Sequence, residues 1–148
     1  MHRDLPHDPY ITAVTTALTA AGLEPTDWWT SDAEVDRYDT GPDAGCTTML
    51  DAHLVWTASV GHPHGLHLLW EHPAEQWQWA PRMQHGELER EPDFLPTLGR
   101  WSDPAAVVAV VRALLAGDPL PERPAPDWHE ADSVRRAVDA WAAAETGE

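Results

Sequence analysis

The chain has 148 residues, 43% of them hydrophobic, and nine tryptophans, so it is about one domain long and has enough apolar material for a core. Its formal net charge of −16 reflects 25 carboxylates against nine basic residues, all of them arginine. This excess argues against a nucleic-acid partner, because binding to a phosphate backbone requires clustered basic side chains.

The first predicted element is a helix near the start of the chain. Asp8 is a suitable N-cap, Pro9 suits the first helical position, and Gly22 suits the position just past the end. Between them, apolar side chains recur at steps of three and four, as expected for one buried helix face. They are Tyr10 or Ile11, Val14, Leu18 and Ala21.

Strand patterns occupy the middle of the chain. Alternating apolar residues predict strands over 50–60, 66–71 and 76–79, separated by turn residues such as those at 61–65. We expect these strands to form an antiparallel meander with one solvent-facing side. Residues 27–31 predict a fourth strand, and residues 32–45 and 82–100 are read as loops.

A second helix is predicted between Asp103-Pro104 and Gly117, with the same capping residues as the first. The prolines of 118–126 indicate an extended linker. Asp127 and Glu130 form a capping-box pattern that predicts a last amphipathic helix within 127–148, packing on the domain or on a partner. The predicted fold is therefore α+β: an N-terminal helix, a three- to four-stranded antiparallel meander, and two C-terminal helices. Residues 1–117 form the compact domain.

Several of these segments resemble a family of small actinobacterial proteins of unknown function. They are Gly22-Leu23 after the first helix, Leu69-Trp70-Glu71-His72, Trp77-Gln78-Trp79, and Asp103-Pro104 followed by Val110-Val111-Arg112-Ala113-Leu114-Leu115. The resemblance covers residues 9–117 and implies an α+β fold and a GC-rich, actinobacterial origin. It implies no catalytic residues.

Histidines are the residues most suited to a metal site. His53 and His67 fall on the solvent-facing side of neighbouring predicted strands, near Glu71, and imidazoles with a carboxylate on rigid strands are typical of open metal sites. No HExxH or paired CxxC motif accompanies them. We therefore favour exposed histidines over a native metal site, and we expect no cofactor.

Motifs for covalent or phosphate chemistry are missing from the sequence. It has no G-x-S-x-G elbow, no P-loop and no G-x-G-x-x-G. Cys46 is the only cysteine, which excludes an internal disulfide, and we expect it to be buried and inert. The first residues lack the apolar region of a signal peptide, and no apolar run has the length of a membrane span, so we expect a cytoplasmic protein without a membrane partner.

Acidic and aromatic side chains point to a protein partner. Adjacent Trp28 and Trp29 cannot both face the core of a strand, and tryptophan is enriched at interface anchors. An acidic surface would steer a basic partner. The candidate partner-binding residues are Glu87, Glu89, Glu91, Asp93, Trp28, Trp29 and Trp141.

These observations favour a non-enzymatic, acidic protein-binding module, such as a regulator, inhibitor, immunity-type protein or adaptor, with a basic macromolecular partner. Two alternatives remain open. One is a small metal-binding protein or metal-dependent enzyme that uses the histidines. The other is a structural or assembly protein whose terminal helix exchanges between subunits of a homo-oligomer.

Overall fold

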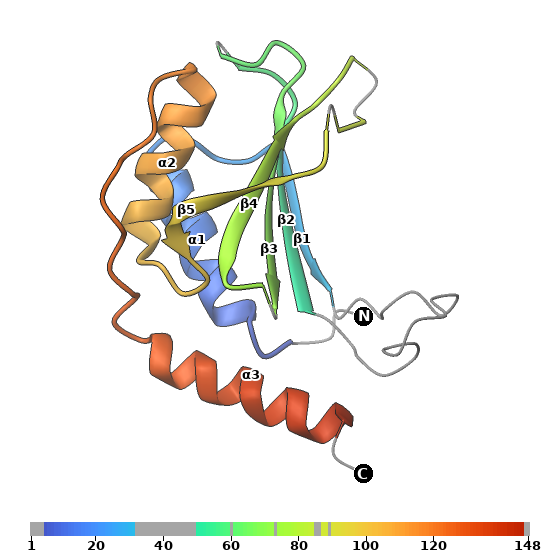
Figure 1. The fold of residues 1–148 in the computed structure, drawn as a ribbon, viewed down its shortest axis with the longest axis vertical. Helices are drawn as coiled ribbons and strands as arrows, with labels where there is room; N and C mark the ends of the chain where they lie inside the picture. The colour runs from blue at the N-terminus through green and yellow to red at the C-terminus, as the bar shows by residue number, and fades with distance from the viewer. Residues whose placement is uncertain are drawn as a thin grey trace.

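The computed structural model describes residues 5–31, 50–59, 61–72, 74–84, 87–88 and 90–146, with the side chains of 142–146 excepted. The fold is α+β, with one helix before an antiparallel sheet and two helices after it (Figure 1). The elements are α1 (Asp8–Ala20), β1 (Asp27–Ser31), β2 (Leu50–Trp56), β3 (Leu66–His72), β4 (Gln76–Pro81), β5 (Asp93–Gly99), α2 (Pro104–Ala116) and α3 (Ala131–Thr146).

The five strands form one sheet in the order β1-β2-β3-β4-β5, and each neighbouring pair is antiparallel. Helices α1 and α2 lie side by side against one face of this meander, and α3 lies across one end (Figure 1). In β2, Leu50, Ala52 and Leu54 are fully buried toward the helices, as their alternation predicted. The other face of the sheet carries polar and apolar side chains, which in β2 and β3 are Asp51, His53, Val55, His67, Leu69 and Glu71.

Strand β5 was not predicted, because residues 82–100 were read as an irregular excursion. Pro96 argues against a strand in sequence, since proline cannot donate to a ladder. In the structure β5 is an edge strand, where a missing donor is tolerated, and a register shift between Gln76 and Gln78 adapts it to β4. The sheet therefore has five strands, one more than the upper limit of the prediction.

Helix termini agree with the sequence in part. Asp103 accepts a hydrogen bond from the Ala105 amide (3.2 Å) at the start of α2, and Gly117 ends that helix in the left-handed conformation, as predicted. Asp8 was predicted to be the N-cap of α1, but it is the first helical residue. Its carboxylate instead accepts hydrogen bonds from the Leu5 amide (2.9 Å) and from the Thr30 hydroxyl (2.7 Å), which fastens α1 to β1.

The proline-rich residues 118–126 run along the domain. The Ala125 amide donates to the Thr97 carbonyl in β5 (2.9 Å), and the Trp128 amide donates to the Trp101 carbonyl (2.8 Å). This pairing keeps the backbone extended past Asp127, so α3 begins at residue 131 rather than at the predicted capping box. Helix α3 then buries Ala131, Val134 and Val138 in the hydrophobic core of its own chain.

Tyr10 of α1 joins these layers. Its fully buried hydroxyl donates to the Ser102 carbonyl (2.6 Å) and accepts from the indole nitrogen of Trp77 (3.3 Å). Burial raises the pKa of Tyr10 well above its ordinary value. The hydrogen bond from Trp77 offsets part of this rise, and the charges of Asp127 and Asp103 add to it. In the described part of the chain, no helix is both long enough and apolar enough to cross a membrane.

Candidate functional site

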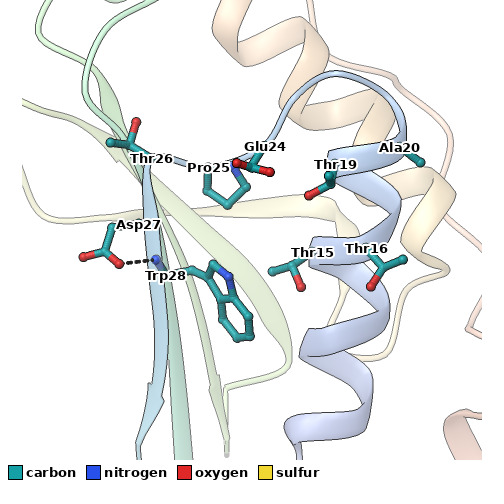
Figure 2. Close-up of a pocket in the computed structure, with 9 residues that line it drawn as sticks. All are labelled: Thr15, Thr16, Thr19, Ala20, Glu24, Pro25, Thr26, Asp27 and Trp28. Atoms are coloured by element: carbon teal, nitrogen blue, oxygen red, sulfur yellow. Dashed lines mark hydrogen bonds between the residues drawn. The ribbon is translucent and has the colours of Figure 1, made fainter.

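A groove of about 730 Å³ separates α1 from the edge strand β1. Helix α1 contributes Thr15, Thr16 and Thr19 to its wall, and Trp28 extends toward them from β1 (Figure 2). The connection between the two elements closes one end of the groove. The described residues that line it are Thr15, Thr16, Thr19, Ala20, Glu24, Pro25, Thr26, Asp27 and Trp28.

Trp28 is unusual for a residue on the helix-facing side of the sheet. It pairs with Leu54, which is fully buried, yet 40% of Trp28 is exposed. The difference follows from position: β2 has strands on both sides, whereas β1 is at the edge and borders the groove. The groove therefore offers an aromatic surface together with hydroxyl groups and the Glu24 carboxylate, whereas the Asp27 side chain turns to the other side of β1 (Figure 2); among the described residues of the lining there is no basic side chain.

Trp29 points to the opposite, open face of the sheet, as expected for the neighbour of Trp28, and 43% of it is exposed. Its indole stacks on the His53 ring with centroids 4.9 Å apart and planes 17° apart. It meets the His67 ring edge-on at 6.2 Å. These three side chains come from three consecutive strands, because β1, β2 and β3 are neighbours in the sheet.

The two histidines belong to a chain of polar contacts across the strands. His53 Nδ1 lies 2.8 Å from His67 Nε2, and His53 Nε2 lies 3.5 Å from an Asp51 carboxylate oxygen. The Ser31 hydroxyl donates to the other carboxylate oxygen of Asp51. Asp51 therefore orients His53. It was not among the predicted site residues, although the alternation in β2 places it on the same face of the strand as His53.

Electrostatics sets the charge of this cluster. Burial raises the pKa of Asp51, but the contacts with His53 and Ser31 and the charges of His53 and His7 outweigh it, so the pKa lies below its ordinary value. Burial, reinforced by the charges of His53 and Arg82, lowers the pKa of His67 to about 4. At neutral pH Asp51 is thus a carboxylate and His67 a neutral imidazole.

Glu71 lies on the same face but not beside His67. It is paired in register with Asp51, and it accepts a hydrogen bond from the Gln78 side chain (2.7 Å). Four residues of strand separate Glu71 from His67, which is about 13 Å at roughly 3.3 Å per residue. Among the residues that the structure describes, no group of three or more His, Cys, Asp or Glu side chains is arranged to hold a metal ion.

The remaining partner-binding candidates lie elsewhere. In the acidic run, Glu87, Glu91 and Asp93 are exposed, and Asp93 forms an ion pair with Arg90 (3.1 Å). Glu89, the fourth member of the run, is outside the described residues, as is Cys46.

Trp141 lies in α3 and is partly buried against the core. Its ring is therefore less available to a partner than the rings of Trp28 and Trp29, which are 40% and 43% exposed.

The polar cluster is not arranged for attack by a serine. The Ser31 hydroxyl donates to a carboxylate, whereas an activated serine donates to an imidazole that acts as its base. A groove with an aromatic wall borders one side of β1, and two imidazoles lie beside Trp29 on the other.

Comparison of the chain with protein-family models, with curated proteins and with solved structures finds no match. The resemblance to an actinobacterial family stays a prediction.

Proposed function

We propose that this chain is a non-enzymatic protein-binding module that receives an extended, basic segment of a partner in the groove between α1 and β1. The observation that carries the proposal is the groove, which combines about 730 Å³ of open space, an edge strand, and the 40% exposed Trp28 in its wall.

The edge strand supports an extended partner. Extended segments add to exposed sheet edges through backbone hydrogen bonds, while side-chain pockets give specificity. β1 is the first strand of the sheet, and the Trp28 amide donates to the carboxylate of its own neighbour, Asp27 (2.9 Å). A partner carbonyl that replaced this carboxylate at the amide would leave Asp27 available to pair with a basic side chain.

Charge supports a basic partner. Among the described residues of the groove lining, the charged ones are Glu24 and Asp27, and the whole chain carries a formal charge of −16. An arginine or lysine over the exposed Trp28 ring would gain roughly 0.5–2 kcal/mol from the cation–π interaction. We propose that the acidic run Glu87, Glu89, Glu91 and Asp93 adds to the field that accelerates association.

The other predicted functions have less support. Exchange of α3 between subunits stays a prediction, and in this chain α3 packs its apolar side chains into its own core. The cytoplasmic location also stays a prediction. The metal-binding alternative has a specific observation behind it, the contact between His53 and His67.

The test is to select short random peptides on the immobilised full chain and then to measure their binding in solution. We expect an enrichment of Arg and Lys, and an affinity that falls as salt is raised past physiological strength, where the Debye length is about 8 Å. Trp28→Ala should remove most of the binding. Phe94→Ala is the matched control, because Phe94 is an exposed aromatic residue outside the groove lining.

Peptides with no excess of basic residues would contradict the charge argument. Binding that survives Trp28→Ala, or that falls equally in Phe94→Ala, would place the partner away from the groove.

A further inference from the structure

We propose that His53 and His67 form a second binding site, in which the two imidazoles hold a borderline transition-metal ion such as Zn²⁺, Ni²⁺ or Cu²⁺ on the open face of the sheet. The site is independent of the groove, and it can be present or absent whatever binds there.

The geometry brings two ring nitrogens to one point. His53 Nδ1 and His67 Nε2 are 2.8 Å apart and stand on the neighbouring strands β2 and β3. Two nitrogens on one tetrahedral zinc ion, each at about 2.0–2.1 Å, are about 3.3 Å apart. Opening this contact by about half an ångström, and turning each ring so that its nitrogen lone pair points at the ion rather than at the other ring, makes room for the ion.

Asp51 prepares His53 as a ligand. A metal-bound histidine typically donates its other ring N–H to a carboxylate, which fixes its tautomer and orientation. Here the Asp51 carboxylate lies 3.5 Å from His53 Nε2 and is itself held by the Ser31 hydroxyl. With the proton of His53 on Nε2, the lone pair of Nδ1 faces His67.

His67 supplies the second nitrogen. A metal ligand must present an unprotonated ring nitrogen, and His67 Nε2 lies 2.8 Å from His53 Nδ1. When an ion replaces the hydrogen bond between the rings, His67 coordinates through Nε2 and carries its proton on Nδ1.

The charge around the rings also permits a cation. Arg82 acts on His67 with a positive charge, whereas the Asp51 carboxylate lies 3.5 Å from His53 Nε2 with a negative one. The open sides of the ion are left for water or for a ligand atom of a partner. With two protein ligands, the site should bind metal reversibly and more weakly than a closed structural zinc site.

The test is a calorimetric titration of the full chain with Zn²⁺ after treatment with a chelator. We expect saturable binding that His53→Ala and His67→Ala each abolish. The matched control is His64→Ala, because His64 is an exposed histidine in the loop between the same two strands. Asp51→Asn should retain the ligands and weaken binding about 10-fold or more, as is usual for the loss of an orienting carboxylate.

Two further measurements distinguish a loss of metal binding from misfolding of the variants. In the wild-type chain, NMR signals of the His53 and His67 rings should shift on addition of Zn²⁺ while that of His64 does not. Cu²⁺ should bind more tightly than Zn²⁺ and quench Trp29, which stacks on His53. Trp29→Phe should lose this quenching and keep the binding.

Absence of saturable binding in the wild type would overturn the proposal. So would ring shifts confined to other histidines, or an affinity that is the same in His53→Ala and in the wild type.

Discussion

The Tyr10 hydroxyl offers the most direct test of how the layers of this fold are joined. Tyr10→Phe removes one oxygen atom and keeps the ring, so the contacts with Trp70, Trp77, Trp101 and Trp128 remain. The hydroxyl lies in a fully buried position, where water cannot take its place.

The expected effect follows from the two partners of that hydroxyl. The Ser102 carbonyl loses its donor at 2.6 Å, and the indole N–H of Trp77 loses its acceptor at 3.3 Å. A buried polar group without a partner costs about 1–3 kcal/mol. Because the Trp77 contact is the longer of the two, we expect the free energy of unfolding to fall by about 2–4 kcal/mol in total. That is a large part of the roughly 5–15 kcal/mol typical of a folded domain.

The assay is urea unfolding followed by circular dichroism at neutral pH. The midpoint should fall while the slope with urea is unchanged, which would show that stability and not the exposed surface has changed. A loss below about 0.5 kcal/mol, the range of neutral surface substitutions, would refute the assignment of this hydroxyl as a buried link between α1 and the residues after β5.

The same variant has a pH signature. The pKa of Tyr10 is raised in the folded state, so the folded chain holds the phenolic proton more tightly than the unfolded chain. Its contribution to stability is fully present below the unfolded pKa of about 10 and is lost as pH rises above it, by up to about 1.4 kcal/mol per pH unit. The wild type should therefore lose more stability than Tyr10→Phe above about pH 10. Equal losses would show that Tyr10 ionises as freely as in the unfolded chain.

Two further stability predictions concern α3 and a turn. Val138→Ala should lower the free energy of urea unfolding by about 2 kcal/mol, because Val138 is fully buried. The exposed control Ala140→Ser should have little effect. Equal effects of the two substitutions would mean that α3 is not packed on the core at Val138. Gly65→Ala should lower the melting temperature much more than Gly22→Ala. Both glycines have positive φ, but a Cβ at Gly65 would meet the Trp56 carbonyl, while one at Gly22 meets nothing within 4 Å; similar losses would show that φ alone decides.

Local sequence patterns predicted the elements that need only one buried face or one capping residue to be recognised. The alternation from Leu50 to Trp56 identified a strand and its buried side, because side chains on a strand point to opposite faces in turn. Gly117 marked the end of α2 because glycine adopts the left-handed conformation there without strain. Strand β5 was missed because the tolerance for Pro96 depends on its place at the sheet edge, which the local sequence does not contain.

Long-range pairing limited the prediction of the site. The alternation of side chains along the strands predicted that His53 and His67 lie on the same side of the sheet. The 2.8 Å contact between their rings, however, depends on the register of β2 with β3. The same register puts Glu71 opposite Asp51 and away from His67. The start of α3 was predicted too early for a similar reason. Asp127 is a residue type that often caps helices, but here its segment pairs with the residues that follow β5 and stays extended.

The exposure of two adjacent tryptophans has one physical explanation in this fold. In an inner strand, Trp28 would be covered by helices on one face, and Trp29 would be flanked by strands on both sides. At the edge, Trp28 borders the groove beside α1 while Trp29 covers the imidazoles of the open face, so both keep about two fifths of their surface in water. Exposed indoles are enriched where proteins bind partners. Strand β1 therefore lies between the two binding surfaces proposed here, with one tryptophan facing each of them.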